Sequence, residues 1–203
     1  MMKSVLTAVL LSLLLVSCKQ STEPDSNDEP VKGFDKITEL YGLHNNIDLI
    51  SSKSEGMLKT GDLAPDFLVK TDDNIEFSLS DLRGKVVYME FWRTRCHFCV
   101  QAMPGMVEAT NSIEDEDFVV IAVSTDATDN VSESRVSEFV DEYNMGNFVN
   151  IYDGMSVNTS IGYQYGITGT PIGFLIDKEG RVVRLLHPSS STFKSSILEE
   201  LDK

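Results

Sequence analysis

Hydrophobic and polar positions between Thr60 and Lys203 alternate between strand-like and helix-like patterns. Apolar runs predict buried strands at 86–91, 118–123, 148–151 and 172–176. A turn at 177–180 joins the last run to 181–186, which predicts a β-hairpin. Helix-like spacing predicts helices over 96–110, 131–143, 157–165 and 190–201. Together these elements predict an α/β domain with a mixed central β-sheet flanked by helices.

The first residues have the layout of a secretory signal. Lys3 is followed by an almost wholly apolar stretch from Val5 to Val16, which is too short for a comfortable membrane span. The closing tetrapeptide Leu15-Val16-Ser17-Cys18 resembles the lipobox of bacterial lipoproteins. This resemblance implies that residues 1–17 are removed and that Cys18 carries lipid. Lys19 and Gln20 lack the aspartate that often retains lipoproteins in the inner membrane, which slightly favours the outer membrane.

The segment between this signal and the domain is polar at first. Residues 19–30 are acidic and interrupted by proline, which predicts a disordered, solvated tether. From Phe34 to Ile50 some apolar spacing returns, and this stretch is either a short helix on the domain or part of the linker. We therefore assign 18–59 to a lipidated N-terminus and linker, and 60–203 to the domain.

The charge of the chain limits its partners. A formal net charge of −15 disfavours binding to nucleic acid or to an anionic membrane surface. Membrane attachment would therefore depend on lipid at Cys18. Three cysteines are present, so assigning Cys18 to lipid leaves a single pair.

That pair, Cys96-His97-Phe98-Cys99, follows an apolar run and begins a predicted helix. A helix N-terminus stabilises a thiolate, and two cysteines at this spacing can form and break a disulfide reversibly. A structural disulfide would close too short a loop to restrict the unfolded chain much. A zinc site would need a second cysteine pair, which the chain lacks. The spacing predicts a redox-active disulfide that needs no metal or other cofactor.

The residues around this pair resemble a known superfamily. Phe91 to Cys99, Pro104 and Gly169-Thr170-Pro171 are similar to thioredoxin-superfamily motifs. The stretches 64–67, 79–85 and 165–171 resemble the TlpA-like and ResA-like membrane-anchored thiol–disulfide oxidoreductases, which share features with the AhpC/TSA and Redoxin domains. The resemblance implies a thioredoxin-like fold, protein thiol or disulfide substrates, an envelope redox partner and a periplasm-facing location. Cys96 is expected to be the nucleophile and Cys99 the resolving cysteine.

The same resemblance implies roles for residues outside the pair. Pro171 corresponds to a cis-proline beside the disulfide, and a cis bond would expose the Thr170 backbone to an extended substrate. Trp92 is expected beside the disulfide, at the substrate-binding site. Glu90 shares a strand face with Tyr88 and is placed beneath the disulfide, where a desolvated carboxyl could accept the proton of Cys99. The alternative for Glu90 is a structural pair with lysine or arginine.

Two differences from the family bear on the chemistry. The ResA-like glutamate three residues after the second cysteine is replaced by Ala102, which leaves Glu90 as the nearby acid. Arg93, Arg95 and His97 make a small positive cluster, which would favour a Cys96 thiolate and a more oxidising couple. The alternative is that these side chains are solvated and have little influence.

Two other functions compete with disulfide exchange. A peroxiredoxin-like peroxidase would have a threonine three residues before its cysteine, but Arg93 holds that position and Thr94 is one residue too close. A copper-binding chaperone could use both cysteines and a histidine, because thiolates select Cu(I), although related chaperones have wider cysteine spacing.

Overall fold

The computed structural model of this chain describes residues 31–32, 40–50, 55–70, 75–153 and 160–203. The predicted signal, Cys18 and the tether over 19–30 lie outside these residues.

The central element is a six-stranded mixed sheet with the strand order β10-β9-β6-β7-β8-β2. Its strands are β2 (Gly42–His44), β6 (Val86–Trp92), β7 (Phe118–Ser124), β8 (Val149–Tyr152), β9 (Ile172–Ile176) and β10 (Val182–Leu185). β6, β7, β8 and β2 run parallel, whereas β9 is antiparallel to β6 and forms a hairpin with β10. The predicted central strands and hairpin are confirmed. β6 and β7 are buried along their whole length because both faces of the sheet are covered.

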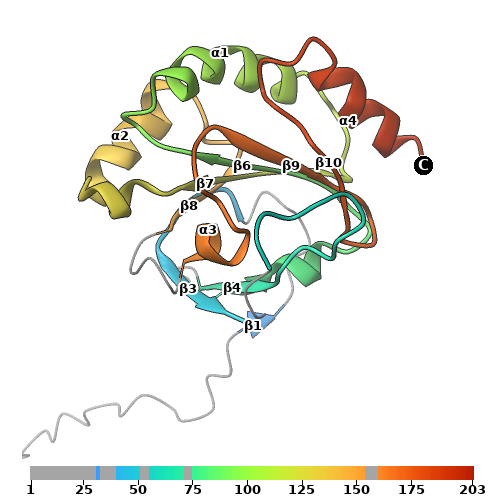
Figure 1. The fold of residues 1–203 in the computed structure, drawn as a ribbon, viewed down its shortest axis with the longest axis horizontal. Helices are drawn as coiled ribbons and strands as arrows, with labels where there is room; N and C mark the ends of the chain where they lie inside the picture. The colour runs from blue at the N-terminus through green and yellow to red at the C-terminus, as the bar shows by residue number, and fades with distance from the viewer. Residues whose placement is uncertain (1–30, 33–39, 51–54, 71–74, 154–159) are drawn as a thin grey trace, which may run out of the picture.

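Three helices cover one face of this sheet (Figure 1). They are α1 (His97–Asn111), α2 (Glu133–Glu142) and α4 (Phe193–Leu201). Their apolar sides pack in one cluster with β6 residues Val86, Tyr88 and Trp92. The short α3 (Ile161–Gln164) lies on the other face. The helices predicted over 96–110, 131–143 and 190–201 are confirmed, with α1 beginning directly after Cys96. Of the helix predicted over 157–165, residues 157–159 lie outside the described residues, and α3 forms the part that is described.

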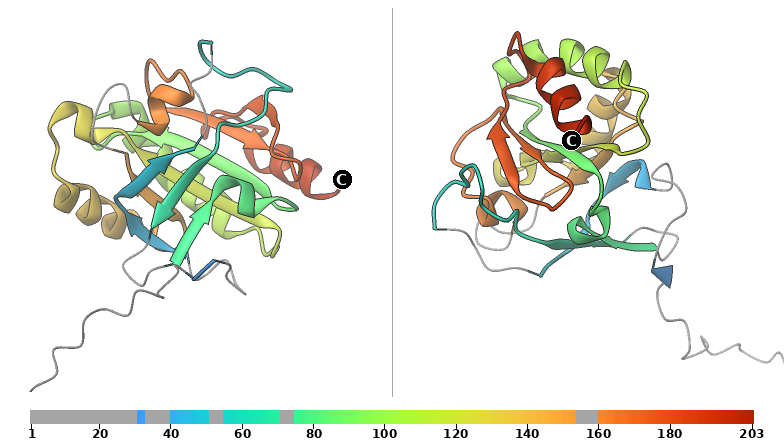
Figure 2. Two further views of the ribbon diagram at one scale, coloured as in Figure 1. Left: turned by 90° about the horizontal axis from the view of Figure 1, so that it is seen from below. Right: turned by 90° about the vertical axis from the view of Figure 1, so that its right-hand side faces the viewer.

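A second sheet covers the opposite face, as the two views of Figure 2 show. It contains β1 (Val31–Lys32), β3 (Asn46–Leu49), β4 (Phe67–Lys70) and β5 (Ile75–Ser78), in the order β1-β5-β4-β3. The 3-10 turn η2 (Leu79–Leu82) follows it. Phe67, Val69 and Phe77 from this sheet pack against β6 residues of the central sheet, including Met89 and Phe91. The second sheet and the helices therefore cover the two opposite faces of the central sheet.

The linker prediction is wrong for residues 42–49. β2 pairs in parallel with β8 at the edge of the central sheet, and β3 pairs antiparallel with β4. The described part of the stretch 34–50 is therefore neither a helix nor a linker. Ile47 and Leu49 lie on one face of β3 with a period of two, and both are half-buried against the core cluster that contains Phe67 and Val69 of β4.

Within the described part of the chain, no helix has both the length and the apolar character needed to cross a membrane.

Candidate active site around Cys96 and Cys99

The two cysteines form a disulfide where β6 leads into α1. Cys96 has extended backbone dihedrals and occupies the N-cap of α1, and the backbone N–H of Cys99 donates to its sulfur at 3.2 Å. Cys96 is half-buried, whereas the side chain of Cys99 is buried in the core. An approaching molecule therefore meets the Cys96 sulfur. The N–H donor and the free N–H groups of the first helical turn stabilise negative charge on that sulfur after reduction.

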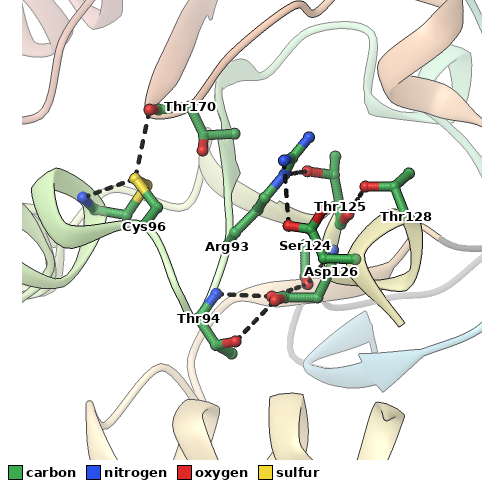
Figure 3. Close-up of polar contacts among 10 residues, drawn as sticks. Arg93, Thr94, Cys96, Ser124, Thr125, Asp126, Thr128 and Thr170 are labelled. Carbon is green, nitrogen blue, oxygen red and sulfur yellow. Dashed lines mark hydrogen bonds and ion pairs between the residues drawn. A yellow bond between two sulfur atoms is a disulfide. The ribbon is translucent and has the colours of Figure 1, made fainter. Parts of the chain in front are cut away.

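The loop before β9 lies beside Cys96. The Thr170–Pro171 peptide bond is cis, and the carbonyl oxygen of Thr170 is 3.4 Å from the Cys96 sulfur (Figure 3). The two positions are far apart in sequence but close in space because β9 pairs with β6, with Ile172 opposite Phe91. Thr170 and Pro171 are both half-buried, so part of this backbone is open to solvent.

A buried carboxyl group holds the loop between β6 and Cys96. Asp126 has no solvent exposure and accepts hydrogen bonds from the backbone N–H of Thr94 at 2.8 Å and its hydroxyl at 2.7 Å. The Ser124 hydroxyl donates to the same carboxylate at 2.8 Å (Figure 3). We call Thr94, Ser124 and Asp126 the loop clamp.

Sequence reasoning missed this clamp. The available signal was the run Ser124-Thr125-Asp126 directly after a buried strand. Parallel neighbouring strands end at the same edge of a sheet, so polar residues at the end of β7 lie beside the end of β6.

Arg93 turns away from the disulfide. Its Nε donates to the Thr125 hydroxyl at 2.8 Å, and one guanidinium nitrogen pairs with Asp129 at 3.2 Å. In Figure 3 the guanidinium points to the side opposite Cys96. Arg93 is therefore paired with an acid, and its influence on the Cys96 thiolate stays a prediction. Arg95 and His97 are exposed directly beside Cys96, and their influence on the thiolate stays a prediction.

Glu90 lies on the face of β6 that packs against α1, the helix that contains Cys99. It is 1% exposed and stands between Tyr88 and Trp92, both of which pack in the cluster that contains Cys99. Burial raises the pKa of Glu90 to about 8, although a hydrogen bond from the Tyr88 hydroxyl lowers it. Among the described residues no lysine or arginine pairs with Glu90, so the ion-pair alternative is wrong for this part of the chain.

Trp92 does not face the solvent. Its side chain is completely buried and its ring stacks on Phe139 with centroids 4.7 Å apart. The expectation that Trp92 contacts a substrate directly is therefore wrong. Trp92 instead belongs to the core beneath the disulfide, in the same cluster as Cys99.

The described residues contain no group of three or more histidine, cysteine, aspartate or glutamate side chains placed to hold a metal ion.

Comparisons with known proteins identify the family of this chain. The Redoxin family profile matches residues 59–201. Thiol-disulfide oxidoreductase ResA of Bacillus thuringiensis is 36% identical over 126 residues, which cover 62% of this chain and 68% of that protein. Thioredoxin-like protein YneN of Bacillus subtilis is 32% identical over 151 residues, 74% of this chain and 84% of that protein.

Solved structures show the same architecture. The thioredoxin domain of a thiol-disulfide oxidoreductase from Bacteroides vulgatus is 25% identical with a TM-score of 0.56, covering 70% of this chain and 97% of that one. A candidate thiol:disulfide interchange protein DsbE from Chlorobium tepidum is 28% identical with a TM-score of 0.56, covering 71% and 96%. The chain therefore belongs to the Redoxin family and is a thiol–disulfide oxidoreductase with a thioredoxin-like fold.

Proposed function

We propose that this protein exchanges disulfides with protein substrates in the cell envelope, with Cys96 as nucleophile and Cys99 as resolving cysteine. The observation that carries this proposal is the difference between the two sulfurs. Cys96 is open to a partner at a helix N-terminus, whereas Cys99 is buried behind it.

Reduction of a substrate proceeds in two displacements. The Cys96 thiolate attacks a substrate disulfide, one substrate sulfur leaves as a thiolate, and a mixed disulfide forms. Cys99 then gives its proton to the Glu90 carboxylate and attacks the Cys96 sulfur, which releases the second substrate thiolate. Two electrons pass from the enzyme dithiol to the substrate, and both substrate thiolates take up protons. Oxidation of a substrate dithiol breaks and forms the same bonds in reverse.

Proton transfer to Glu90 is supported by its position and its raised pKa. A carboxylate with a pKa of about 8 is close in proton affinity to an ordinary thiol, so a proton can move between them at little cost. Ala102 stands where ResA-like proteins are expected to have a glutamate, and its side chain is an alkyl group. Glu90 is therefore the side chain that accepts the Cys99 proton in this proposal.

The Thr170 backbone provides a place for the substrate. Its carbonyl oxygen lies 3.4 Å from the Cys96 sulfur and belongs to a partly exposed loop at the end of the sheet. An extended substrate segment can pair with this backbone as an added strand, which would bring its cysteine to Cys96. Phe98, 67% exposed within the cysteine pair, offers an apolar contact beside the same sulfur.

Location follows from the N-terminal sequence. A secretory signal over 1–17 and lipid on Cys18 would place the domain on the periplasmic side of a membrane, with the outer membrane slightly favoured.

The peroxidase and copper-chaperone alternatives have less support. The Thr94 hydroxyl donates to Asp126 and belongs to the loop clamp, so it is not available to a peroxide bound at Cys96. No third ligand group for copper accompanies the two cysteines among the described residues.

Trapping tests the proposal. A Cys99→Ala variant keeps the nucleophile but cannot resolve the mixed disulfide, so it is expected to retain envelope proteins that dithiothreitol releases. The matched control is the Cys96→Ser/Cys99→Ala double variant, which should retain none. Equal capture by both variants, or wild-type thiols that stay inert to dithiothreitol and to disulfide reagents, would overturn the proposed function.

A further inference from the structure

The Tyr88 hydroxyl has two acceptors in the core beneath the disulfide. Tyr88 has no solvent exposure, and its hydroxyl contacts Glu90 Oε2 and also lies 3.1 Å from the carbonyl oxygen of Leu186. A hydroxyl has one hydrogen, so it donates to one of these oxygens at a time. The acceptor that it chooses depends on whether Glu90 carries a proton.

Each protonation state of Glu90 has a complete hydrogen-bond arrangement. When Glu90 is ionised, the Tyr88 hydroxyl donates to the carboxylate. When Glu90 is protonated, its own O–H can donate to the Tyr88 oxygen, and the Tyr88 hydrogen turns to the Leu186 carbonyl. Neither state leaves a buried polar hydrogen without an acceptor, which would otherwise cost about 1–3 kcal/mol.

The space for this arrangement comes from a glycine. Gly173 of β9 pairs with Glu90 across the sheet, and a Cβ at Gly173 would collide with the Tyr88 hydroxyl and lie only 2.7 Å from Glu90 Oε2. The Leu186 backbone N–H donates to the Gly173 carbonyl at 2.8 Å, which fixes the second acceptor. The rings of Phe193 and Tyr88 form a T-shaped pair with centroids 4.8 Å apart. The Tyr88 ring, the Glu90 carboxyl and the Leu186 carbonyl are therefore all held in place. Only the hydrogen of the Tyr88 hydroxyl needs to move when its acceptor changes.

Other titratable groups on the surrounding elements are further from this centre or engaged elsewhere. β7 and β9 have none, and Cys99 is the buried one on α1. Glu200 on α4 is also buried, and it pairs with Lys203. The rest are exposed or half-buried: His97 and Glu108 on α1, Glu133, Arg135, Glu138, Asp141 and Glu142 on α2, Arg184 on β10, His187 after it, and Lys194 and Glu199 on α4. Tyr88 is thus the polar group in contact with Glu90.

We propose that Tyr88 is a positioning residue for proton transfer, whose hydroxyl turns from the Glu90 carboxyl to the Leu186 carbonyl when Glu90 accepts the Cys99 proton. The inference rests on the proposed role of Glu90 in resolution. The balance is one proton: it leaves the Cys99 sulfur, arrives on a Glu90 oxygen and later passes to solvent, while Tyr88 keeps its own hydrogen throughout.

The test is a titration of Glu90 that does not require activity. Carboxyl-labelled glutamate is followed by 13C NMR in the oxidised protein, and the Glu90 signal is assigned by its loss in Glu90→Gln. Tyr88→Phe removes the donor that favours the charged form, so the midpoint should rise by about one to two pH units. The matched control is Tyr165→Phe, because the Tyr165 hydroxyl is also buried but bonds to Pro65 on the other side of the sheet. Its Glu90 midpoint should equal that of the wild type.

A second measurement covers the case in which Tyr88→Phe does not fold. In the wild type with 13C-labelled tyrosine, the infrared C–O stretching band of Tyr88 should shift across the Glu90 midpoint, and this shift should be absent in Glu90→Gln. An unchanged midpoint in folded Tyr88→Phe, or a wild-type band that stays constant across the titration, would overturn the inference. Failure of the trapping experiment alongside a normal Tyr88 effect would instead remove the proposed function and leave the hydrogen-bond switch intact.

Discussion

Two carboxyl groups are buried near the disulfide, and their surroundings differ. Asp126, at the end of β7, receives two hydrogen bonds from Thr94 and one from Ser124. Glu90, in the middle of β6, contacts the single Tyr88 hydroxyl, and burial raises its pKa to about 8. The first acid holds the loop after β6 in place through donors from that loop and from the last residue of β7. The second acid has a single hydroxyl donor, so its environment allows it to take up and release a proton. The number of fixed donors around a buried acid therefore separates an anchor from a proton acceptor.

The largest expected effect is on the pH dependence of stability. The folded-state pKa of Glu90 lies above its ordinary value of 4.5, so folded protein keeps this proton while unfolded protein loses it. The contribution of the Glu90 proton to the free energy of unfolding is fully present below pH 4.5 and is lost as the pH rises to about 8. The loss is roughly 1.4 kcal/mol per pH unit in the middle of this range and flattens near pH 8. It amounts to about 4 kcal/mol between pH 4.5 and pH 8, of which about 2 kcal/mol falls between pH 6 and pH 8.

Urea unfolding of oxidised wild type and Glu90→Gln at several pH values measures this difference. Above pH 6 the change in stability reports on Glu90 and not on Asp153. Burial raises the pKa of Asp153 only to about 6, so the pH dependence that Asp153 causes is complete below that value. The two proteins should converge in stability at low pH and separate as the pH rises. Parallel curves from pH 6 to pH 8 would show that Glu90 is not held protonated.

The second effect is on the rate of resolution. Above pH 8, Glu90→Gln should release a thiol from the Cys96 mixed disulfide about 100-fold more slowly than wild type, because Cys99 loses its proton acceptor. The wild-type rate should rise with pH around the Glu90 midpoint, and the variant should lack this rise. Stopped-flow fluorescence of Trp92, the one tryptophan in the chain, can follow the reaction. Glu108→Gln, an exposed change on α1, is the control, and a similar slowing there would point to helix damage instead.

The smallest effect belongs to the loop clamp. Asp126→Ala leaves the Thr94 N–H without its acceptor, and we expect a loss of about 2 kcal/mol in unfolding free energy. The pH midpoint of resolution should stay at its wild-type value, since Asp126 takes no part in the proton transfer. Asp129→Ala removes only a half-exposed ion pair with Arg93 and should cost less than about 1 kcal/mol. A shifted midpoint in Asp126→Ala would erase the distinction between the two acids.

Much of the fold could be predicted because its central strands are continuous apolar runs. Val86 to Phe91 and Phe118 to Val123 are buried on both faces, so their sequences have a strong and simple signal. The second sheet has four-residue or shorter strands, whose patterns are too brief to separate from loops. The strands over 42–44 and 46–49 could not be predicted from spacing, because each depends on a partner, β8 or β4, that lies further along the sequence.

The site was predictable only where chemistry depends on neighbours in sequence. The cysteine spacing indicated a redox pair, and the alternation along β6 placed Glu90 on the correct face. Asp126 and Gly173 lie at the site because β7 and β9 pair with β6. The spacing of residues along the chain does not predict which strands pair. The direction of the Arg93 side chain depends on Asp129, a residue of a different loop.

The exposure of a single sulfur has a kinetic consequence. Because Cys99 is enclosed, a substrate and any protein that restores the redox state of the cysteine pair would both dock over Cys96. The two proteins would occupy the same small area and therefore bind one after the other. An excess of either one would slow the binding of the other. Turnover is then an alternation of two half-reactions, and no ternary complex forms along the way.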